Sequence, residues 1–251
     1  METKVRKPFQ GVTNIIRFNW HFYVIAGGLI ISLLVAAVSF NTPYTFILHV
    51  IVIFITLTIT LSLAVSYYVY DYSPLYRLTW LNDLISHKEP VVVNVNAGFD
   101  ETSTLLARHF PKAQLHVFDF YDRKKHTEVS IERARKAYEP YPGTVQITTA
   151  KIPVGEGSAD LLFNIFSLHE VRNQEERIAF LQNQHSILND EGTCVVMEHL
   201  RDTSNFLAYN IGFFHFFSAT EWRYNFSKAG FKIDRIIKIT SFVSVFILKK
   251  L

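Results

Sequence analysis

Two apolar blocks without a charged residue dominate the N-terminal part of the chain. Residues 18–70 contain no Lys, Arg, Asp or Glu, and the apolar stretch is interrupted at Asn41-Thr42-Pro43. As helices, residues 20–40 would match the roughly 30 Å hydrocarbon core of a bilayer, and residues 44–69 would exceed it. Aromatic residues lie near the block ends, as in the belts at membrane interfaces: they are Trp20, Tyr23, Tyr44, Tyr67, Tyr68 and Tyr70. The pattern predicts two transmembrane helices; the alternatives are a buried hairpin of a soluble protein and a cleaved signal peptide.

Short apolar strands alternate with helical patterns from residue 90 onward. Val91 begins a β-branched run typical of a strand that is buried on both faces, a turn with Gly98 follows, and Pro111 ends the next helix. A second apolar strand ends on Asp119. Further strands are expected at 145–149, 160–166 and 192–197, and helices at 126–138 and 173–188. This alternation predicts an α/β domain with a doubly wound, mostly parallel sheet.

Composition supports this division of the chain. The chain has 251 residues, of which 49% are hydrophobic and 19% are charged, and its mean hydropathy is positive at +0.15. We therefore expect a membrane anchor at 1–70, a juxtamembrane connector at 71–89 and the α/β domain at 90–251. The connector is interpreted either as an ordinary connecting helix or as part of a lid for a membrane-dissolved substrate.

The distribution of basic residues indicates how the two spans are oriented. Basic residues precede the first block, namely Lys4, Arg6, Lys7 and Arg17, whereas the short loop between the blocks has none. Because cytoplasmic segments carry the excess of Lys and Arg, we expect both termini and the α/β domain in the cytoplasm, below an inner or plasma membrane. The single Cys194 fits a reducing compartment and excludes an internal disulfide.

The turn after the first strand and the end of the second strand form the expected ligand site. The carboxyl ends of the central strands of a doubly wound sheet flank a ligand crevice, and an acid such as Asp119 is placed there to accept hydrogen bonds from ribose hydroxyls. The turn has one glycine, Gly98, and Asp100 lies close to it. This differs from the G-x-G-x-x-G turn that binds pyrophosphate; the carboxylate would repel pyrophosphate and would tolerate a cationic cofactor.

Residues 91–122 resemble the first motifs of class I S-adenosylmethionine-dependent methyltransferases. The family's acidic-x-Gly-x-Gly turn would fall on Asn94, Asn96 and Gly98, so two of the three positions differ from the pattern. Segments similar to later motifs follow at 151–161, 189–193 and 222–231. The resemblance implies a seven-stranded Rossmann-like sheet, methyltransferase activity and S-adenosylmethionine as the cofactor. The cofactor-binding positions that it implies are Asn94, Asn96, Ala97, Gly98, Asp119, Phe120, Thr149 and Phe166.

Titratable residues follow the fourth and fifth expected strands, facing the cofactor crevice. Methyl transfer needs alignment of the reacting atoms, and a base when the acceptor is a hydroxyl or an acidic carbon. We expect His169 or His199 to be that base, with Glu198 or Glu170 orienting it. The catalytic candidates are therefore His169, Glu198 and His199. The alternative is that each histidine only hydrogen-bonds a loop; no metal site is predicted, since a ligand spacing such as H-x-x-x-H is missing.

Residues 205–217 are unusually rich in aromatic side chains. We interpret them either as a buried crossover helix or as one wall of an apolar acceptor pocket, with Tyr209, Asn210 and His215 as its polar, substrate-binding groups. The expected acceptor is a lipophilic small molecule such as a lipid, a quinone or an alkyl-phenol. The net charge is +3, and the basic residues are scattered along the chain instead of forming a stripe, so no nucleic-acid partner is expected.

Two hypotheses of function remain open at this point. The first is a membrane-anchored methyltransferase whose partners are the lipid bilayer and the lipophilic acceptor. The second is a catalytically inactive, methyltransferase-like binding or scaffold subunit at the membrane, which the departures at Asn94 and Asn96 motivate. The oligomeric state is not predicted.

Overall fold

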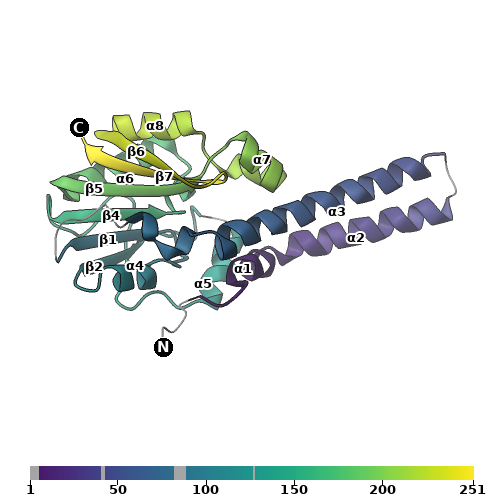
Figure 1. Ribbon diagram of the computed structural model, residues 1–251, viewed down its shortest axis with the longest axis horizontal. Coiled ribbons are helices and arrows are strands. Elements are labelled where there is room, and N and C mark those ends of the chain that lie inside the picture. The colour runs from purple at the N-terminus through teal and green to yellow at the C-terminus, as the bar shows by residue number, and fades with distance from the viewer. Residues whose placement is uncertain (1–5, 41–42, 82–88, 127) are drawn as a thin grey trace.

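The computed structural model describes residues 6–40, 43–81, 89–126 and 128–251. Lys4, the interruption at Asn41-Thr42 and residues 82–88 of the expected connector lie outside the described residues. In the described part, an α/β domain contains both the N-terminal and C-terminal segments, and a long helical hairpin projects from it (Figure 1).

Seven strands of the described chain form one mixed sheet with the order β3-β2-β1-β4-β5-β7-β6. The strands are β1 (Val91–Asn96), β2 (Gln114–Asp119), β3 (Val145–Gln146), β4 (Ala159–Ile165), β5 (Leu188–His199), β6 (Phe231–Thr240) and β7 (Val243–Lys250). Strands β1 to β5 pair in parallel, and β7 pairs antiparallel with both β5 and β6. The chain winds outward from β1 to β3 and then crosses to β4, so the switch point lies between β1 and β4. The expected doubly wound, mostly parallel α/β sheet is thereby confirmed.

Both faces of the sheet are covered, which explains why its central strands are apolar at successive positions. Val92 and Leu161 face one core cluster, whereas the next residues along each strand, Val93 and Leu162, face the other. Helix α4 (Ser103–His109) contributes buried side chains to the cluster of Val92, whereas α6 (Gln174–Ile187) and α8 (Ala219–Lys228) contribute to the cluster of Val93. Helix α5 (Val129–Ala137) buries Ala134.

The connector belongs to the core of the domain. It begins in a π-helical turn, η1 (Tyr68–Tyr72), and its described residues then form two 3-10 turns, η2 (Leu75–Arg77) and η3 (Thr79–Leu81), where the first interpretation expected a connecting helix. The side chains of Leu75 and Leu81 are each 1% exposed and pack in the same cluster as Val92.

Two helices form the projecting hairpin and match the expected spans closely. They are α2 (Trp20–Ser39, 20 residues) and α3 (Thr45–Tyr67, 23 residues), so α2 is about 30 Å long. Both are long and apolar enough to cross a membrane, and almost none of the residues in their apolar stretches is fully buried within the protein. Val38, for example, is 83% exposed.

A further helix, α1 (Gln10–Phe18), precedes the hairpin and was not predicted from the sequence. It packs beside α5, α3 and η1 (Figure 1). The carboxylate of Asp71 accepts hydrogen bonds from the backbone N–H groups of Gly11 and Val12, both at 2.8 Å. Arg6 also forms an ion pair with Glu101 at 2.6 Å. The N-terminal segment is therefore fastened to the α/β domain instead of belonging to the hairpin.

Several expected boundaries differ from the structure. The helix expected at 126–138 begins at Val129, the strand expected at 145–149 is a two-residue strand, and the strand expected at 192–197 extends over Leu188–His199. Residues 205–217 do not form one helix. Instead α7 (Thr203–Tyr209) is followed by a 3-10 segment, η5 (Asn210–His215), because Asn210 has a left-handed φ of 50° that ends the α-helix.

Candidate functional site

The turn after β1 is held by the two asparagines that replace the family's usual residues. The Asn96 amide donates to the Phe118 carbonyl (3.1 Å), and its side-chain oxygen accepts from the N–H of Gly98 (3.0 Å). The Asn94 amide donates to the hydroxyl of Ser103 at 2.8 Å and so ties β1 to α4. Asn96 therefore gives the turn side-chain hydrogen bonds that a glycine at this position could not form.

Gly98 is required at its position by both backbone angle and space. Its φ is +95°, and an added Cβ would lie 2.9 Å from Nη1 of Arg135 and 3.0 Å from Cβ of Tyr121. After the turn, Oδ1 of Asp100 accepts from the backbone N–H groups of Thr102 (2.8 Å) and Ser103 (2.9 Å). Asp100 thus caps the first N–H groups of α4, and its carboxylate stays at the edge of the turn.

Asp119, the expected ribose acid, is 4% exposed at the end of β2. Its Oδ1 accepts from the N–H of Tyr121 at 2.8 Å, and its Oδ2 forms an ion pair with Nη1 of Arg135 on α5. The guanidinium also lies over the ring of Tyr121, 4.7 Å from its centroid. This contact between Arg135 and Asp119 was not predicted from the sequence.

A hollow opens above the turn and Asp119, with about 400 Å³ of empty space that includes open solvent. It is lined by three of the expected cofactor residues, Asn96, Gly98 and Asp119. The other lining residues are Phe99, Asp100, Arg135, Tyr138, Glu139, Pro140 and Thr144. The structure thus brings the turn and the ribose acid to one cavity, as expected.

Helix α1 completes one edge of this hollow. The ring of Phe18 packs edge-on against the lining residue Phe99, with centroids 5.6 Å apart. The hydroxyl of Tyr138, another lining residue, donates to Oδ1 of Asn14 at 2.8 Å. Residues before the hairpin therefore support the candidate cofactor site.

Other expected cofactor residues lie outside the described lining of this hollow. Asn94 and Ala97 are buried in and beside β1, and Phe120 packs its ring on Phe180 in the core. The hydroxyl of Thr149 donates to Glu176 at 2.5 Å. Phe166 has a left-handed φ of 50°, and its ring stacks on His199 at 5.0 Å. A role for these residues in cofactor binding stays a prediction.

The ends of β4 and β5 bring His169 and Glu198 together, as the catalytic prediction required. Nδ1 of His169 donates to Oε2 of Glu198 at 2.6 Å, and the His169 backbone N–H lies 3.3 Å from Oε1 of the same carboxylate. Burial disfavours a charged His169 ring, but Glu198 and Glu170 outweigh this effect and raise its pKa to about 10. At neutral pH the ring is therefore protonated on both nitrogens and positively charged.

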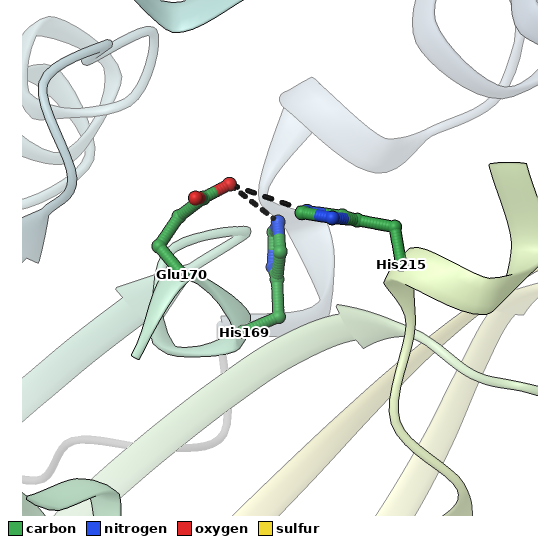
Figure 2. Close-up of side chains that lie close together, drawn as sticks. All are labelled: His169, Glu170 and His215. Carbon is green, nitrogen blue, oxygen red and sulfur yellow. Dashed lines mark hydrogen bonds and ion pairs between the residues drawn. The ribbon is translucent and has the colours of Figure 1, made fainter. Parts of the chain in front are cut away.

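One carboxylate oxygen of Glu170 contacts two histidines (Figure 2). Its Oε1 is 3.2 Å from Nε2 of His169 and 3.3 Å from Nε2 of His215, although His215 is 45 residues further along the chain. Burial opposes ionisation of Glu170, but hydrogen bonds from the two rings hold its pKa well below its usual range. The sequence analysis named Glu170 and His215 separately and did not predict their contact.

His199 has a different environment from His169. Its Nδ1 donates to the Phe242 carbonyl at 2.9 Å, so its Nε2 accepts from the hydroxyl of Tyr70 at 2.7 Å. Burial is the main cause that lowers the pKa of His199 to about 4. This neutral ring has both nitrogens engaged, and a role as the base stays a prediction.

The aromatic segment reaches the hairpin. Helix α7 lies against α3 near the point where the hairpin leaves the domain (Figure 1). Apolar side chains of α7 and η5 are exposed to solvent, and we call them the apolar rim: Phe206, Leu207, Ile211 and Phe214. Of the expected substrate-binding residues, His215 lies in the cluster of Figure 2, Tyr209 packs on His199 with centroids 5.4 Å apart, and Asn210 forms the break after α7.

Comparison with known proteins places the fold. No protein-family model matches the chain, and no curated protein matches its sequence significantly. A SAM-dependent methyltransferase structure from Aquifex aeolicus matches at a TM-score of 0.54 with 15% identity, covering 72% of this chain and 94% of its own. A SAM-dependent methyltransferase structure from Methanosarcina mazei matches at 0.50 with 13% identity, covering 69% and 97% respectively. The α/β domain of this protein therefore has the fold of S-adenosylmethionine-dependent methyltransferases.

Proposed function

We propose that this protein is a membrane-anchored S-adenosylmethionine-dependent methyltransferase that acts on a lipophilic small molecule. The observation that carries the proposal is the hollow at the carboxyl ends of β1 and β2, where Gly98 and Asp119 meet in a methyltransferase fold. Bound S-adenosylmethionine would supply the methyl group.

The residues that line the hollow fit a cationic nucleoside cofactor. Asp100, Asp119 and Glu139 contribute carboxylates, and Arg135 is the cation among the described lining residues. The Arg135 side chain is 34% exposed, so it can move away from Asp119 into solvent. The freed carboxylate would then accept hydrogen bonds from the ribose hydroxyls.

The cluster at the ends of β4 and β5 is our candidate for the acceptor side of the reaction. With its ring charged, His169 donates hydrogen bonds at neutral pH, and Glu198 holds the ring in one orientation. We assign His169 and Glu198 to orienting the polar group of the acceptor, with His215 at the more exposed side of the cluster. Alignment of this kind supplies much of what methyl transfer needs from a protein.

The membrane placement is supported by the surface of the hairpin. Helices α2 and α3 expose apolar side chains over their whole length, which is unfavourable in water and favourable in lipid. The apolar rim lies beside α3, where the hairpin would enter the bilayer. The 3-10 segment η5 carries two rim residues, Ile211 and Phe214, and also His215 of the cluster. A lipophilic acceptor in the membrane would therefore meet the domain at this rim, and basic residues before α2 favour the cytoplasmic side.

Calorimetric titration of the detergent-purified protein with S-adenosylmethionine and S-adenosylhomocysteine tests the cofactor. We expect saturable binding of both, and loss of binding in Asp119→Ala, because the variant lacks the ribose-binding carboxylate. Asp234→Ala, which removes an exposed carboxylate from β6, is the matched control and should bind normally. Folded wild-type protein that binds neither ligand would overturn the proposal.

A second candidate function is a binding or scaffold subunit that has kept the fold without turnover. The ion pair between Asp119 and Arg135 favours it, because the arginine occupies the carboxylate that ribose would need. Incubation of the protein with membrane-lipid extracts and S-adenosylmethionine labelled in its methyl group separates the two. Label in the lipid fraction supports the enzyme, whereas cofactor binding without any transfer supports the scaffold.

A further inference from the structure

We propose that His169, Glu170 and His215 form a binding site for a divalent transition-metal ion, with Zn²⁺ as the ion that this ligand set suits. The inference departs from the sequence analysis, which expected no metal. Metal binding as such rests on the geometry of the three side chains and does not depend on methyl transfer.

The three side chains converge on one point (Figure 2). Oε1 of Glu170 lies 3.2 Å from Nε2 of His169 and 3.3 Å from Nε2 of His215, and one ligand atom from each residue falls within 4.8 Å of the others. In a tetrahedral zinc site with bonds of about 2.0–2.1 Å, neighbouring ligand atoms are about 3.3–3.4 Å apart. The carboxylate oxygen is therefore already at the spacing from both rings that a shared ion requires.

The far nitrogens of both rings face carboxylates, as in histidines that bind metals. Nδ1 of His169 donates to Glu198 at 2.6 Å, and Nδ1 of His215 lies 3.2 Å from Oε1 of Glu128. A carboxylate at Nδ1 keeps a proton there, so a metal ion that displaces the proton of Nε2 would meet the Nε2 lone pair. Two histidines with this same arrangement are the strongest sign that the cluster holds a cation.

The site has three protein ligands and an accessible side. The side chains of Glu170 and His169 are 6% and 12% exposed, whereas that of His215 is 26% exposed. Two histidines and a glutamate with an open fourth position are typical of zinc sites that bind a substrate or water. Ligand spacing in the sequence does not reveal it, because His169 and Glu170 are adjacent and the 3-10 segment η5 supplies His215.

A role in catalysis follows only if the proposed function holds. The cluster lies where the acceptor is expected, so an oxygen of the acceptor would take the open position of the ion. A bound metal positions such an oxygen and stabilises negative charge on it.

The test uses the full chain in detergent, with a purification tag that contains no histidine, after treatment with a chelator. Titration with Co²⁺ should produce the visible absorption of a tetrahedral site at one equivalent per chain, and Zn²⁺ should displace the Co²⁺. Glu170→Gln and His215→Asn should each lower the affinity for the ion at least about tenfold, and Glu128→Gln should lower it about tenfold. His109→Asn, a histidine on α4 away from the cluster, is the matched control and should bind as the wild type does.

Thermal melting and S-adenosylhomocysteine titration of the same samples separate the possible failures. Folded wild-type protein without saturable metal uptake, or equal uptake by His215→Asn, overturns the metal site whatever the cofactor result. Metal uptake that is lost in the variants, without cofactor binding, upholds the site and overturns the proposed methyltransferase instead. If Glu170→Gln does not fold, the more exposed His215→Asn decides the outcome.

Discussion

The carboxylate of Asp119 at the end of β2 is paired with the guanidinium of Arg135 on α5, across the mouth of the candidate cofactor hollow. The same guanidinium lies against Gly98, the glycine of the turn after β1. The side chain of Arg135 therefore lies against both Asp119 and Gly98, the two residues expected to bind a nucleoside. Binding of the ligand would have to displace this side chain.

Replacing this arginine should strengthen cofactor binding. In Arg135→Ala the carboxylate is free beforehand, and since partly exposed ion pairs contribute about 0.2–1 kcal/mol, we expect S-adenosylhomocysteine to bind more tightly by a factor of about 1.4 to 5. Calorimetry measures the change. Lys136→Ala removes the neighbouring exposed cation and should have no effect. Weaker binding in Arg135→Ala would mean that the arginine itself contacts the ligand.

A methyl group at Gly98 should damage both the turn and the site. Gly98→Ala combines a φ of +95° with a Cβ placed 2.9 Å from Arg135, so we expect a loss of about 1–3 kcal/mol in the free energy of unfolding and weaker cofactor binding. Gly143→Ala is the control, because Gly143 has a φ of +81° but open space around it. Denaturant unfolding of both variants should show the larger loss for Gly98→Ala; equal losses would leave backbone angle as the whole cause.

Acid should destabilise the protein through His199. The folded-state pKa of about 4 lies below the unfolded value of about 6.5, so the neutral ring contributes stability above pH 6.5 that is lost as the pH falls toward 4. The two values correspond to a contribution on the order of 3 kcal/mol. Denaturant unfolding between pH 7.5 and 4.5 measures it.

His199→Gln isolates this contribution from that of the other histidines. Burial also lowers the pKa of His126, His109 and His185, and these groups titrate in both proteins. The variant should be less stable at pH 7.5 but lose less stability on acidification. Parallel pH profiles for variant and wild type would contradict the assignment of a neutral, buried His199.

The apolar rim should lie at the membrane surface. Ile211 is 83% exposed on η5, so a nitroxide label on Ile211→Cys in lipid nanodiscs should relax faster with oxygen, which concentrates in lipid, than with a water-soluble nickel chelate. A label on Asp234→Cys, on β6, should show the reverse preference. The native Cys194 is buried and should not react. A water-exposed label at residue 211 would remove the rim as an entry point for a lipophilic acceptor.

Much of the fold could be predicted because the patterns that encode it are local. The valines from Val91 onward indicate a strand with two buried faces, Pro111 follows the helix that ends at His109, and Asn173 caps α6 through the N–H of Glu176. The hairpin follows from apolar runs of sufficient length. These features depend on residues within a few positions of one another, so the sequence by itself determines them.

The site was predictable only in outline. The positions of Gly98 and Asp119 follow from the strands that carry them, because parallel strands end at the same edge of the sheet. In contrast, the break after α7 could not be read from the aromatic pattern of 205–217, since that pattern suits a helix and a packed loop equally well. Asn210 breaks the helix through its positive φ of 50°, which the spacing of aromatic residues does not encode.

Tertiary structure alone decided which distant side chains meet. Arg135 reaches Asp119 because α5 returns over the end of β2, and Phe18 supports Phe99 because α1 folds back onto the domain. The cluster of Figure 2 forms because η5 carries His215 to Glu170. The sequence by itself determined the elements and the residues at their ends; the path of the chain between elements determined the contacts, since such contacts form only when the whole core has packed.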